Sequence, residues 1–465
     1  MTDKPILLWL RRDLRLADHP ALHAAAASGR PVIPVVIRDA ALDRLGAAAR
    51  WRMGQALAHF DARLQGLGSR LVLRSGPALE VLRGLVAETG AATILWSRAY
   101  DGASVELGRR VKDWAKAHDI TAKSYNGSLL FEPWEVTTAT GGPYRVFTPF
   151  WRAVKDRPVP DPVQAPSQLR PPTHWPDSEI LGSWRLSEGV GRGAEVLARH
   201  ALVGEERARS RFAAFLAGPV ARYATDRDML ALPGCSGMSE PLTYGEVSPR
   251  LLWHLAQGKP GAEAFLRQLV WRDFAWQLFF HRPDMAEENW REGWDGFPWR
   301  GDNAQALAWK QGRSGVPLVD AAMRELYVTG RMHNRARMVS ASYLTKHLLT
   351  DWRVGLRWFA DCLTDWDEAA NAMGWQWVAG TGPDAAPFFR VFNPETQAVR
   401  FDPEGRYRRR WIAEGEAAPT QTALSYFDAV PRSWALDPKA PRPEPALPLA
   451  EGRQRALAAY AAHRT

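Results

Sequence analysis

The chain has 465 residues, of which 46% are hydrophobic and 24% charged, and its formal net charge is +9. This length predicts roughly two or three domains with ample apolar material for a core, and the absence of an apolar run of about 18 residues argues against a membrane span. Only Cys235 and Cys362 occur, which argues against a disulfide framework or a zinc cluster, and the start has no signal-peptide shape, so we expect a reducing, cytoplasmic compartment and no metal.

Two features of the composition point to a class of partner. Basic residues outnumber acidic ones by 60 to 51, which favours a polyanionic partner, although a merely basic cytosolic protein has the same balance. Tryptophan occurs 22 times, mostly in the second half of the chain. Aromatic faces mixed with arginine suit unstacked bases or a flat cofactor.

Residues 1–130 alternate short buried-strand patterns with helical ones. The strand patterns are rich in Val, Ile and Leu and cover Ile6–Leu10, Val32–Ile37, Arg70–Arg74 and Thr93–Ser97. The helical patterns between them cover Ala21–Ala27, Ala48–Leu67, Pro77–Thr89 and Ser104–His118. This alternation predicts an α/β domain with a doubly wound, Rossmann-like parallel sheet. No Gly-x-Gly-x-x-Gly or Walker pattern opens a helix here, so the usual dinucleotide mode is not predicted.

Residues 131–200 read as a connector, because the stretch 157–176 is rich in proline. Residues 201–465 carry helical patterns and few strand signals. The patterns cover Glu205–Phe215, Pro249–Leu255, Ala262–Phe280, Val316–Leu326, Arg335–Leu349, Trp352–Cys362 and Glu451–Ala462. We therefore expect an all-helical second domain whose site is a cavity between helices.

The stretch 330–397 is dense in basic, acidic, amide and indole groups. Asn334 and Arg337 are three residues apart, and Asp367 and Asn371 are four apart, so each pair shares a helix face. Together with Asp365, they predict a charge-balanced polar lining. The alternative is a buried Arg–Asp network with core tryptophans, but buried charges are costly and are usually retained for a reason.

Ordered motifs also occur outside this stretch. They include Leu8-Trp-Leu-Arg-Arg-Asp-Leu-Arg-Leu-Ala-Asp-His-Pro-Ala-Leu22 and the segments 131–134, 146–150, 269–274, 308–324 and 392–397. Over nearly the whole chain the set resembles the photolyase/cryptochrome family, nearest to the bacterial class I enzymes that repair cyclobutane pyrimidine dimers. The resemblance implies an antenna-type α/β domain, a helical domain that binds FAD, active in its reduced form, and damaged DNA as the partner of a monomer.

The resemblance assigns residues to the FAD. The matching positions are Tyr223, Cys235, Ser236, Gly237, Met238, Ser239, Arg337, Asp365, Asp367 and Asn371. Cys235 and Gly237 replace the commoner Thr and Arg or Lys in the loop Gly234–Ser239. Amides and hydroxyls of this loop suit a phosphate, although the loop alone reads equally as a plain turn. We expect Asn371 to act in catalysis as well, because its side-chain amide offers a hydrogen-bond donor and an acceptor to the reactive flavin nitrogen.

Other residues match a relay and a lesion pocket. Trp299, Trp352 and Trp375 match the tryptophans that pass electrons from the surface to the flavin, although each one taken alone reads first as a packing residue. The positions around the flipped dimer are Gln268, Trp271, Asn334, Arg335, Met338 and Trp377. The basic segment Arg406–Arg410 is expected to hold DNA phosphates or to be a solvated turn.

One departure bears on the lesion. Gln268 stands where dimer photolyases usually carry Glu, and an amide donates a hydrogen bond but transfers no proton. Gln is more familiar in (6-4) photoproduct enzymes, but this chain has His333 and Asn334 where animal (6-4) enzymes carry two histidines. We therefore expect light-driven dimer repair. The alternatives are a cryptochrome-like photoreceptor and a (6-4) photolyase. A non-photoactive flavin oxidoreductase or a plain nucleic-acid binder is the third alternative.

An antenna chromophore stays open. Tyr100, Asp101 and Glu106 lie where the family's folate-binding segment falls, but the sequence there diverges from the family's pattern. Glu106 reads equally as an exposed helix residue. The resemblance therefore allows a second chromophore, such as methenyltetrahydrofolate, without assigning it.

Overall fold

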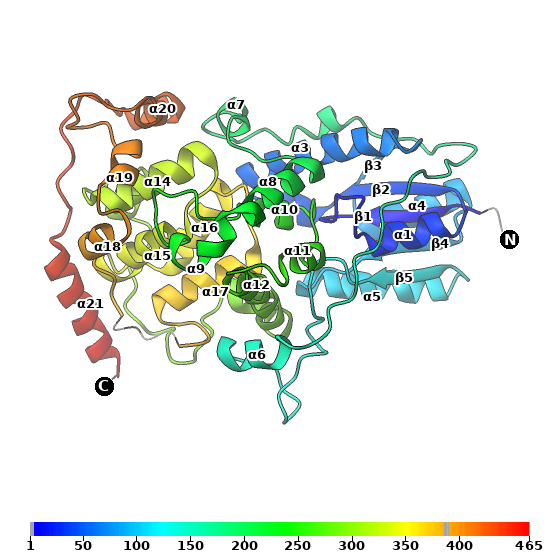
Figure 1. Ribbon diagram of the computed structural model, residues 1–465, viewed down its shortest axis with the longest axis horizontal. Coiled ribbons are helices and arrows are strands. Elements are labelled where there is room, and N and C mark those ends of the chain that lie inside the picture. The colour runs from blue at the N-terminus through cyan, green and yellow to red at the C-terminus, as the bar shows by residue number, and fades with distance from the viewer. Residues whose placement is uncertain (1–3, 386–387, 389, 465) are drawn as a thin grey trace.

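The computed structural model describes residues 4–385, 388 and 390–464. Figure 1 shows an α/β domain that carries the N-terminus at one end and a helical domain that carries the C-terminus at the other. This arrangement confirms the predicted fold class, a doubly wound parallel sheet followed by helices.

The first domain is built on a five-stranded parallel sheet in the order β3-β2-β1-β4-β5. Its strands are β1 (Ile6–Leu10), β2 (Val32–Arg38), β3 (Val72–Ser75), β4 (Thr93–Ser97) and β5 (Thr121–Tyr125). The four predicted strands are confirmed, and they read as apolar runs because helices bury both faces of the sheet. Strand β5 was not predicted because its sequence, Thr-Ala-Lys-Ser-Tyr, is polar. A half-exposed strand at the edge of a sheet tolerates polar residues.

Helices cover the sheet on both sides (Figure 1). Leu8 faces α1 (Pro20–Ala27) and α3 (Ala47–Gln65) in one apolar cluster. The next residue, Trp9, faces α4 (Ala78–Thr89) in the other. The two remaining helices of this domain are α2 (Ala40–Asp43) and α5 (Gly102–Lys116). Successive strand residues thus enter opposite cores, as the period of two requires.

The connector has little regular structure and runs back along the first domain. Leu169 N–H donates to Leu67 O at 2.9 Å, and Glu179 N–H donates to Leu73 O at 2.9 Å. Its short helices are α6 (Phe147–Val154), η1 (Leu181–Trp184) and α7 (Ala194–Ala198). Helix α6 was not predicted, and it forms because one face buries four apolar residues while Pro149 lies in the first turn, where it removes no needed donor.

The second domain is helical. Its elements are α8 (Glu205–Ala217), η2 (Pro219–Arg222), α9 (Tyr223–Asp226), α10 (Ser239–Thr243), α11 (Pro249–Ala256), α12 (Glu263–His281), η3 (Pro283–Ala286), α13 (Ala304–Lys310), α14 (Pro317–Thr329), α15 (Asn334–Ser342), η4 (Tyr343–His347), α16 (Trp352–Cys362), α17 (Glu368–Ala379), α18 (Pro394–Phe401), α19 (Arg406–Trp411), α20 (Gln421–Ala429), η5 (Arg432–Trp434) and α21 (Leu449–Arg464). The predicted helices are present. The long one expected over Arg335–Leu349 is α15 followed by a buried π-helical turn, η4.

Helix α17 is central to this domain, because it packs on α12, α15 and α16. These elements carry most of the predicted site residues. Among the described residues, no helix is both long and apolar enough to cross a membrane.

Candidate functional site

An ion pair between half-buried Arg337 and buried Asp365 joins α15 to the segment before α17. One guanidinium nitrogen of Arg337, Nη2, lies 2.9 Å from both carboxylate oxygens of Asp365. Arg337 Nε also donates to Met332 O at 2.9 Å, which fixes the plane of the guanidinium. Thr243 of α10 donates its hydroxyl to Asp365 O at 3.3 Å. The pair expected from the sequence thus forms one rigid wall that three segments hold.

Asp367 and Asn371 occupy the first turn of α17. Asp367 caps the helix by accepting from Ala370 N–H at 2.9 Å, and its other oxygen accepts from Trp276 Nε1 at 3.0 Å. Asn371 donates Nδ2–H to Asp367 O at 2.8 Å. Both side chains are buried. One amide hydrogen of Asn371 is engaged in this contact, and Oδ1 is the atom with which its side chain can accept a hydrogen bond.

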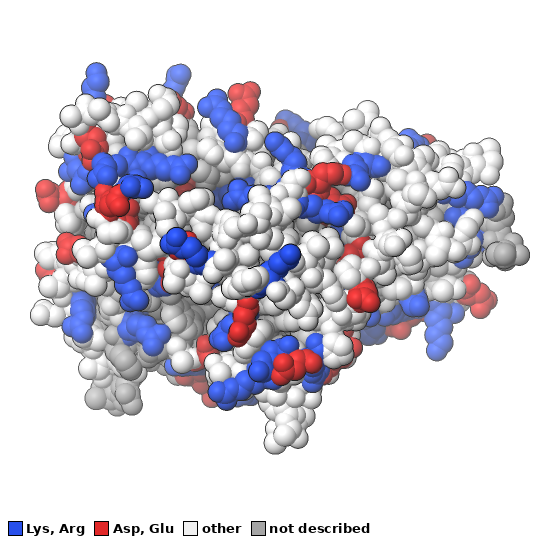
Figure 2. Space-filling model, in the orientation of Figure 1, with Lys and Arg blue, Asp and Glu red and all other residues white. Residues whose placement is uncertain are grey.

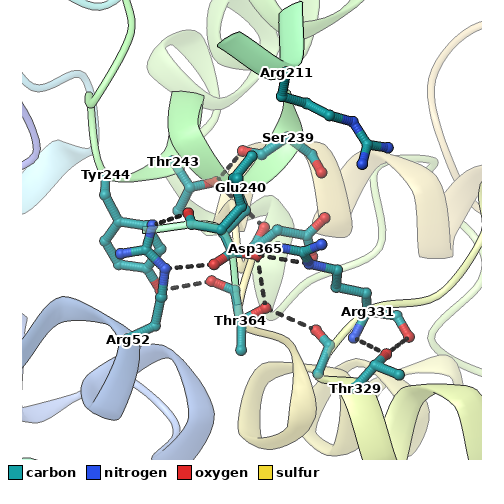
Figure 3. Close-up of polar contacts among 12 residues, drawn as sticks. Arg52, Arg211, Ser239, Glu240, Thr243, Tyr244, Thr329, Arg331, Thr364 and Asp365 are labelled. Carbon is teal, nitrogen blue, oxygen red and sulfur yellow. Dashed lines mark hydrogen bonds and ion pairs between the residues drawn. The ribbon is translucent and has the colours of Figure 1, made fainter. Parts of the chain in front are cut away.

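The loop Gly234–Ser239 ends at the start of α10. Gly237 has φ +73°, and a Cβ there would lie 3.1 Å from a guanidinium nitrogen of Arg211. Arg211, from α8, donates Nε–H to Ser236 O at 3.3 Å. Figure 3 shows Arg211 beside Ser239 at the edge of the polar cluster. The left-handed glycine therefore lets a cation approach the loop closely.

Two predicted residues, Met238 in the loop and Tyr223 of α9, pack into the same apolar cluster. Met238 is buried in the same cluster as Tyr223. The ring of Tyr223 meets Phe215 and Phe265 edge-on, at centroid distances of 5.4 and 5.9 Å. Burial raises the pKa of Tyr223 to about 12, so its hydroxyl stays neutral and can donate a hydrogen bond.

A buried network behind the loop was not predicted. Glu240 accepts from Arg331 Nε at 2.7 Å, from Thr364 Oγ1 at 3.4 Å and from Arg52 of α3 (Figure 3). Arg52 also donates to Glu246 at 2.6 Å. Arg52 belongs to the first domain, so this network ties both domains to the residue that follows Ser239. No local sequence pattern links partners so far apart in the chain.

The predicted lesion residues of α12 lie next to α6. Gln268 and Trp271 are half-buried. The indole of Trp271 stacks on Phe147 at a centroid distance of 3.6 Å and an angle of 9°. Trp377 of α17 is also half-buried, with Arg390 over its ring at 5.7 Å. These residues offer flat aromatic surface at the boundary between core and solvent.

The residues expected on α15 differ in their surroundings. Asn334 is exposed and lies 3.8 Å from the sulfur of half-buried Met338. Arg335 instead pairs with Asp228 at 2.7 Å and lies 4.3 Å above the ring of Phe401. Its charge is therefore already balanced by a carboxylate, which the sequence pattern did not predict.

Of the three relay candidates, two are buried and one lies nearer to the surface. Trp375 and Trp352 are buried, at 3% and 0% exposure, and Trp299 is half-buried. Trp375 packs against α16, because a Cβ on Gly355 would lie 2.1 Å from the indole. Arg300, next to Trp299, donates its N–H to Leu349 O at 2.7 Å, just before Trp352. The three side chains thus belong to connected segments.

Basic side chains gather over α14 and α19 on the face in Figure 2. Within the predicted basic segment, Arg406 pairs with Glu404 at 2.6 Å and Arg408 with Asp402 at 3.0 Å. Arg409 donates to Glu404 O at 2.6 Å. These partners reduce the net positive potential that the segment offers to a phosphate backbone.

The described residues contain no group of three or more His, Cys, Asp and Glu side chains placed to hold a metal ion.

Comparisons with known proteins cover both domains. One family model, described as DNA photolyase, matches residues 6–167, and another, described as the FAD binding domain of DNA photolyase, matches 265–462. Deoxyribodipyrimidine photo-lyase of Agrobacterium fabrum is 42% identical over 98% of both chains. Cryptochrome-1 of Arabidopsis thaliana is 34% identical over 89% of this chain and 63% of its own. A bacterial class III photolyase from Agrobacterium tumefaciens has a TM-score of 0.92 and 40% identity, covering 100% and 98% of the two chains.

The residues present fit FAD. Arg211 beside Gly237, with the hydroxyls of Ser236 and Ser239, supplies a cation and donors suited to the pyrophosphate. The pair of Arg337 and Asp365 and the buried Asn371 are charged and amide groups that would suit the polar edge of a flavin ring.

Proposed function

The chain belongs to the DNA photolyase family, and on this premise we propose that it uses light to split cyclobutane pyrimidine dimers in DNA. When bound, reduced FAD supplies one electron to the dimer under illumination and recovers it after the cyclobutane bonds break, with no net oxidation. The observation that carries the proposal is the half-buried Arg337 paired with buried Asp365, beside buried Asp367 and Asn371, in a helical domain that matches the family's FAD-binding domain.

On this proposal the chain's own groups have separate tasks. Arg337, fixed by Asp365, holds the polar edge of the flavin ring in place. Asn371 donates one Nδ2 hydrogen to Asp367 O and presents Oδ1 as the acceptor for the flavin ring N–H, whose proton must be kept or lost. The loop Gly234–Ser239 and Arg211 neutralise the pyrophosphate.

The lesion side is proposed from the same resemblance. Trp271 and Trp377 receive the apolar dimer on their flat faces, and Gln268 donates an amide N–H to a pyrimidine carbonyl. Extruding a damaged pair costs a few kcal/mol in base-flipping enzymes, photolyases among them. Aromatic contact of about 1–3 kcal/mol per base offsets much of that cost.

Within the family we propose the class III branch, because the class III photolyase from Agrobacterium tumefaciens has a TM-score of 0.92. This proposal differs from the expectation of class I that the sequence motifs alone support. Cryptochrome-1 of Arabidopsis thaliana has lower identity, 34% against 42%, which favours repair over photoreception. We also propose a monomer in a reducing, cytoplasmic compartment, in keeping with two free cysteines.

For an antenna chromophore we propose the surroundings of Tyr100. Buried Tyr100 lies 6.2 Å from the exposed ring of Trp134, and Arg98 lies 5.8 Å from that same ring. Glu132 pairs with Arg98 at 3.3 Å beneath them. These groups suit a flat ring with polar edges, such as the pterin of methenyltetrahydrofolate. Glu106 instead forms an exposed pair with Arg109 on α5, which supports its reading as an ordinary helix residue.

Repair of defined oligonucleotides tests the function. Purified protein with chemically reduced flavin receives a cyclobutane thymine dimer or a (6-4) photoproduct under light. Restoration of the dimer alone is expected. Restoration of the (6-4) product alone would make Gln268 the decisive residue, and repair of neither with flavin bound would favour a photoreceptor.

Gln268→Glu tests the lesion contact. We expect dimer repair per absorbed photon to stay the same or rise by up to about fivefold, since one hydrogen bond contributes near 1 kcal/mol. Gln305→Glu on α13 carries the same change of charge away from the site and is expected to have no effect. A large loss of dimer repair in Gln268→Glu alone would mean that the pocket is built for another lesion.

A further inference from the structure

His333 lies at the junction between the loop Gly234–Ser239 and α15. Its backbone N–H donates to Glu325 Oε2 at 3.2 Å, and its ring Nδ1 accepts from Arg335 N–H at 3.1 Å, which caps the helix. Its other ring nitrogen, Nε2, lies 3.7 Å from Cys235 Sγ. The imidazole is therefore held on both edges, by its own helix on one side and by the loop on the other.

The protonation of these groups follows from the contacts. Because Nδ1 accepts a hydrogen bond, the proton of the neutral ring is on Nε2 and points to Cys235. Burial lowers the pKa of His333 to about 4 and raises the pKa of the Cys235 thiol, so both groups are neutral near pH 7. The thiol in turn lies 3.8 Å from Arg227 O. A chain of weak hydrogen bonds thus runs from α15 through the loop to the end of α9.

This series of hydrogen bonds joins residues that are proposed to contact two different ligands, FAD and the lesion. Cys235 is in the loop proposed for the FAD pyrophosphate, and Asn334 and Arg335, in the first turn of α15, are proposed to face the lesion. Asp228, the neighbour of Arg227, pairs with Arg335 at 2.7 Å. A shift of the loop therefore reaches the start of α15 directly through Cys235 and His333, and indirectly through the contact of Cys235 with Arg227, whose neighbour Asp228 pairs with Arg335.

We propose that His333 couples FAD binding at the loop Gly234–Ser239 to lesion binding at α15, acting as a positioning residue between the two sites. The inference rests on the proposed function and adds to it a connection between the FAD site and the lesion site, which no single sequence motif contains. An ordered loop fixes Cys235, which fixes the imidazole and so the cap of α15. Coupling between two bound ligands is reciprocal, so the lesion must tighten FAD binding by the factor by which FAD tightens lesion binding.

Release of flavin from the holoprotein tests this coupling. The dissociation constant of FAD is measured by the fluorescence of released flavin, alone, with an oligonucleotide containing one thymine dimer, and with the undamaged oligonucleotide. In the unaltered protein we expect the lesion to tighten FAD by at least about fivefold. His333→Ala and Cys235→Ala are each expected to reduce that factor, and the double variant to reduce it no further than either single one.

Matched variants separate coupling from stability. Thr420→Ala removes the cap of α20, where the hydroxyl accepts from Ala423 N–H at 3.1 Å, and is expected to keep the full factor. Cys235→Thr is expected to keep most of it, because a hydroxyl also accepts from Nε2–H. A wild-type factor in His333→Ala, or reductions that multiply in the double variant, would overturn the inference. Equal tightening by damaged and undamaged DNA would instead count against the proposed function.

Discussion

Glu240→Ala is expected to lower the free energy of unfolding by about 3 kcal/mol, the lower range for breaking a buried ion pair by removing one partner. Glu240 is 1% exposed and Arg52 is 0% exposed. Arg52 keeps Glu246 at 2.6 Å, and Arg331 is partly exposed, so neither arginine is left wholly without compensation. The cost arises from the lost contacts of the buried Glu240 carboxylate to Arg52, Arg331 and Thr364.

The same substitution is expected to weaken flavin retention, because Glu240 follows Ser239 directly and anchors the end of the loop to the first domain. Urea unfolding followed by tryptophan fluorescence and by flavin release measures both effects. Glu106→Ala removes a carboxylate whose pair with Arg109 is fully exposed, and no measurable change is expected there. Equal urea midpoints for the two variants would show that the buried network contributes nothing.

The part of the site that the sequence predicted comes from two short motifs. Arg337 with Asn334, and Asn371 with Asp367, could be predicted because each pair is three or four residues apart and shares a helix face. The predicted fold rests on the same kind of local signal, apolar strands between helices, and it missed the polar edge strand β5 and the short helix α6. Neither prediction required knowledge of packing between domains.

Other features depend on contacts between distant segments. Arg52 and Glu240 are 188 residues apart, and Arg211 and Ser236 are 25 residues apart, with η2 and α9 between them. Arg335 was expected to lie around the lesion, but the packing of Asp228 and Phe401 around it gives its guanidinium an internal partner. Spacing fixes which side of a helix a residue occupies, while the direction of a long side chain depends on what packs there.

Trp375→Phe is expected to slow light-driven reduction of oxidised flavin by an external donor by about 100-fold, equivalent to about 2.7 kcal/mol in the barrier. The indole is 3% exposed and lies between Phe359 at 4.9 Å and Trp309 at 6.2 Å. Phenylalanine fills most of the same volume, so the fold is expected to persist. A benzene ring is much harder to oxidise than an indole, so the inner position of the proposed relay can no longer give up an electron.

Repair by enzyme that has been reduced chemically is expected to be unchanged in Trp375→Phe, because the relay serves only to restore the reduced state. Flash photolysis and a dimer repair assay on the same samples separate the two processes. Trp253→Phe is the control, since Trp253 is similarly buried, at 4%, but belongs to α11 and a different apolar cluster. If both variants photoreduce at the same rate, Trp375 has no place in the relay. If Trp375→Phe also loses repair by reduced enzyme, its contribution is to the packing of α16 against α17, where Gly355 leaves room for the indole.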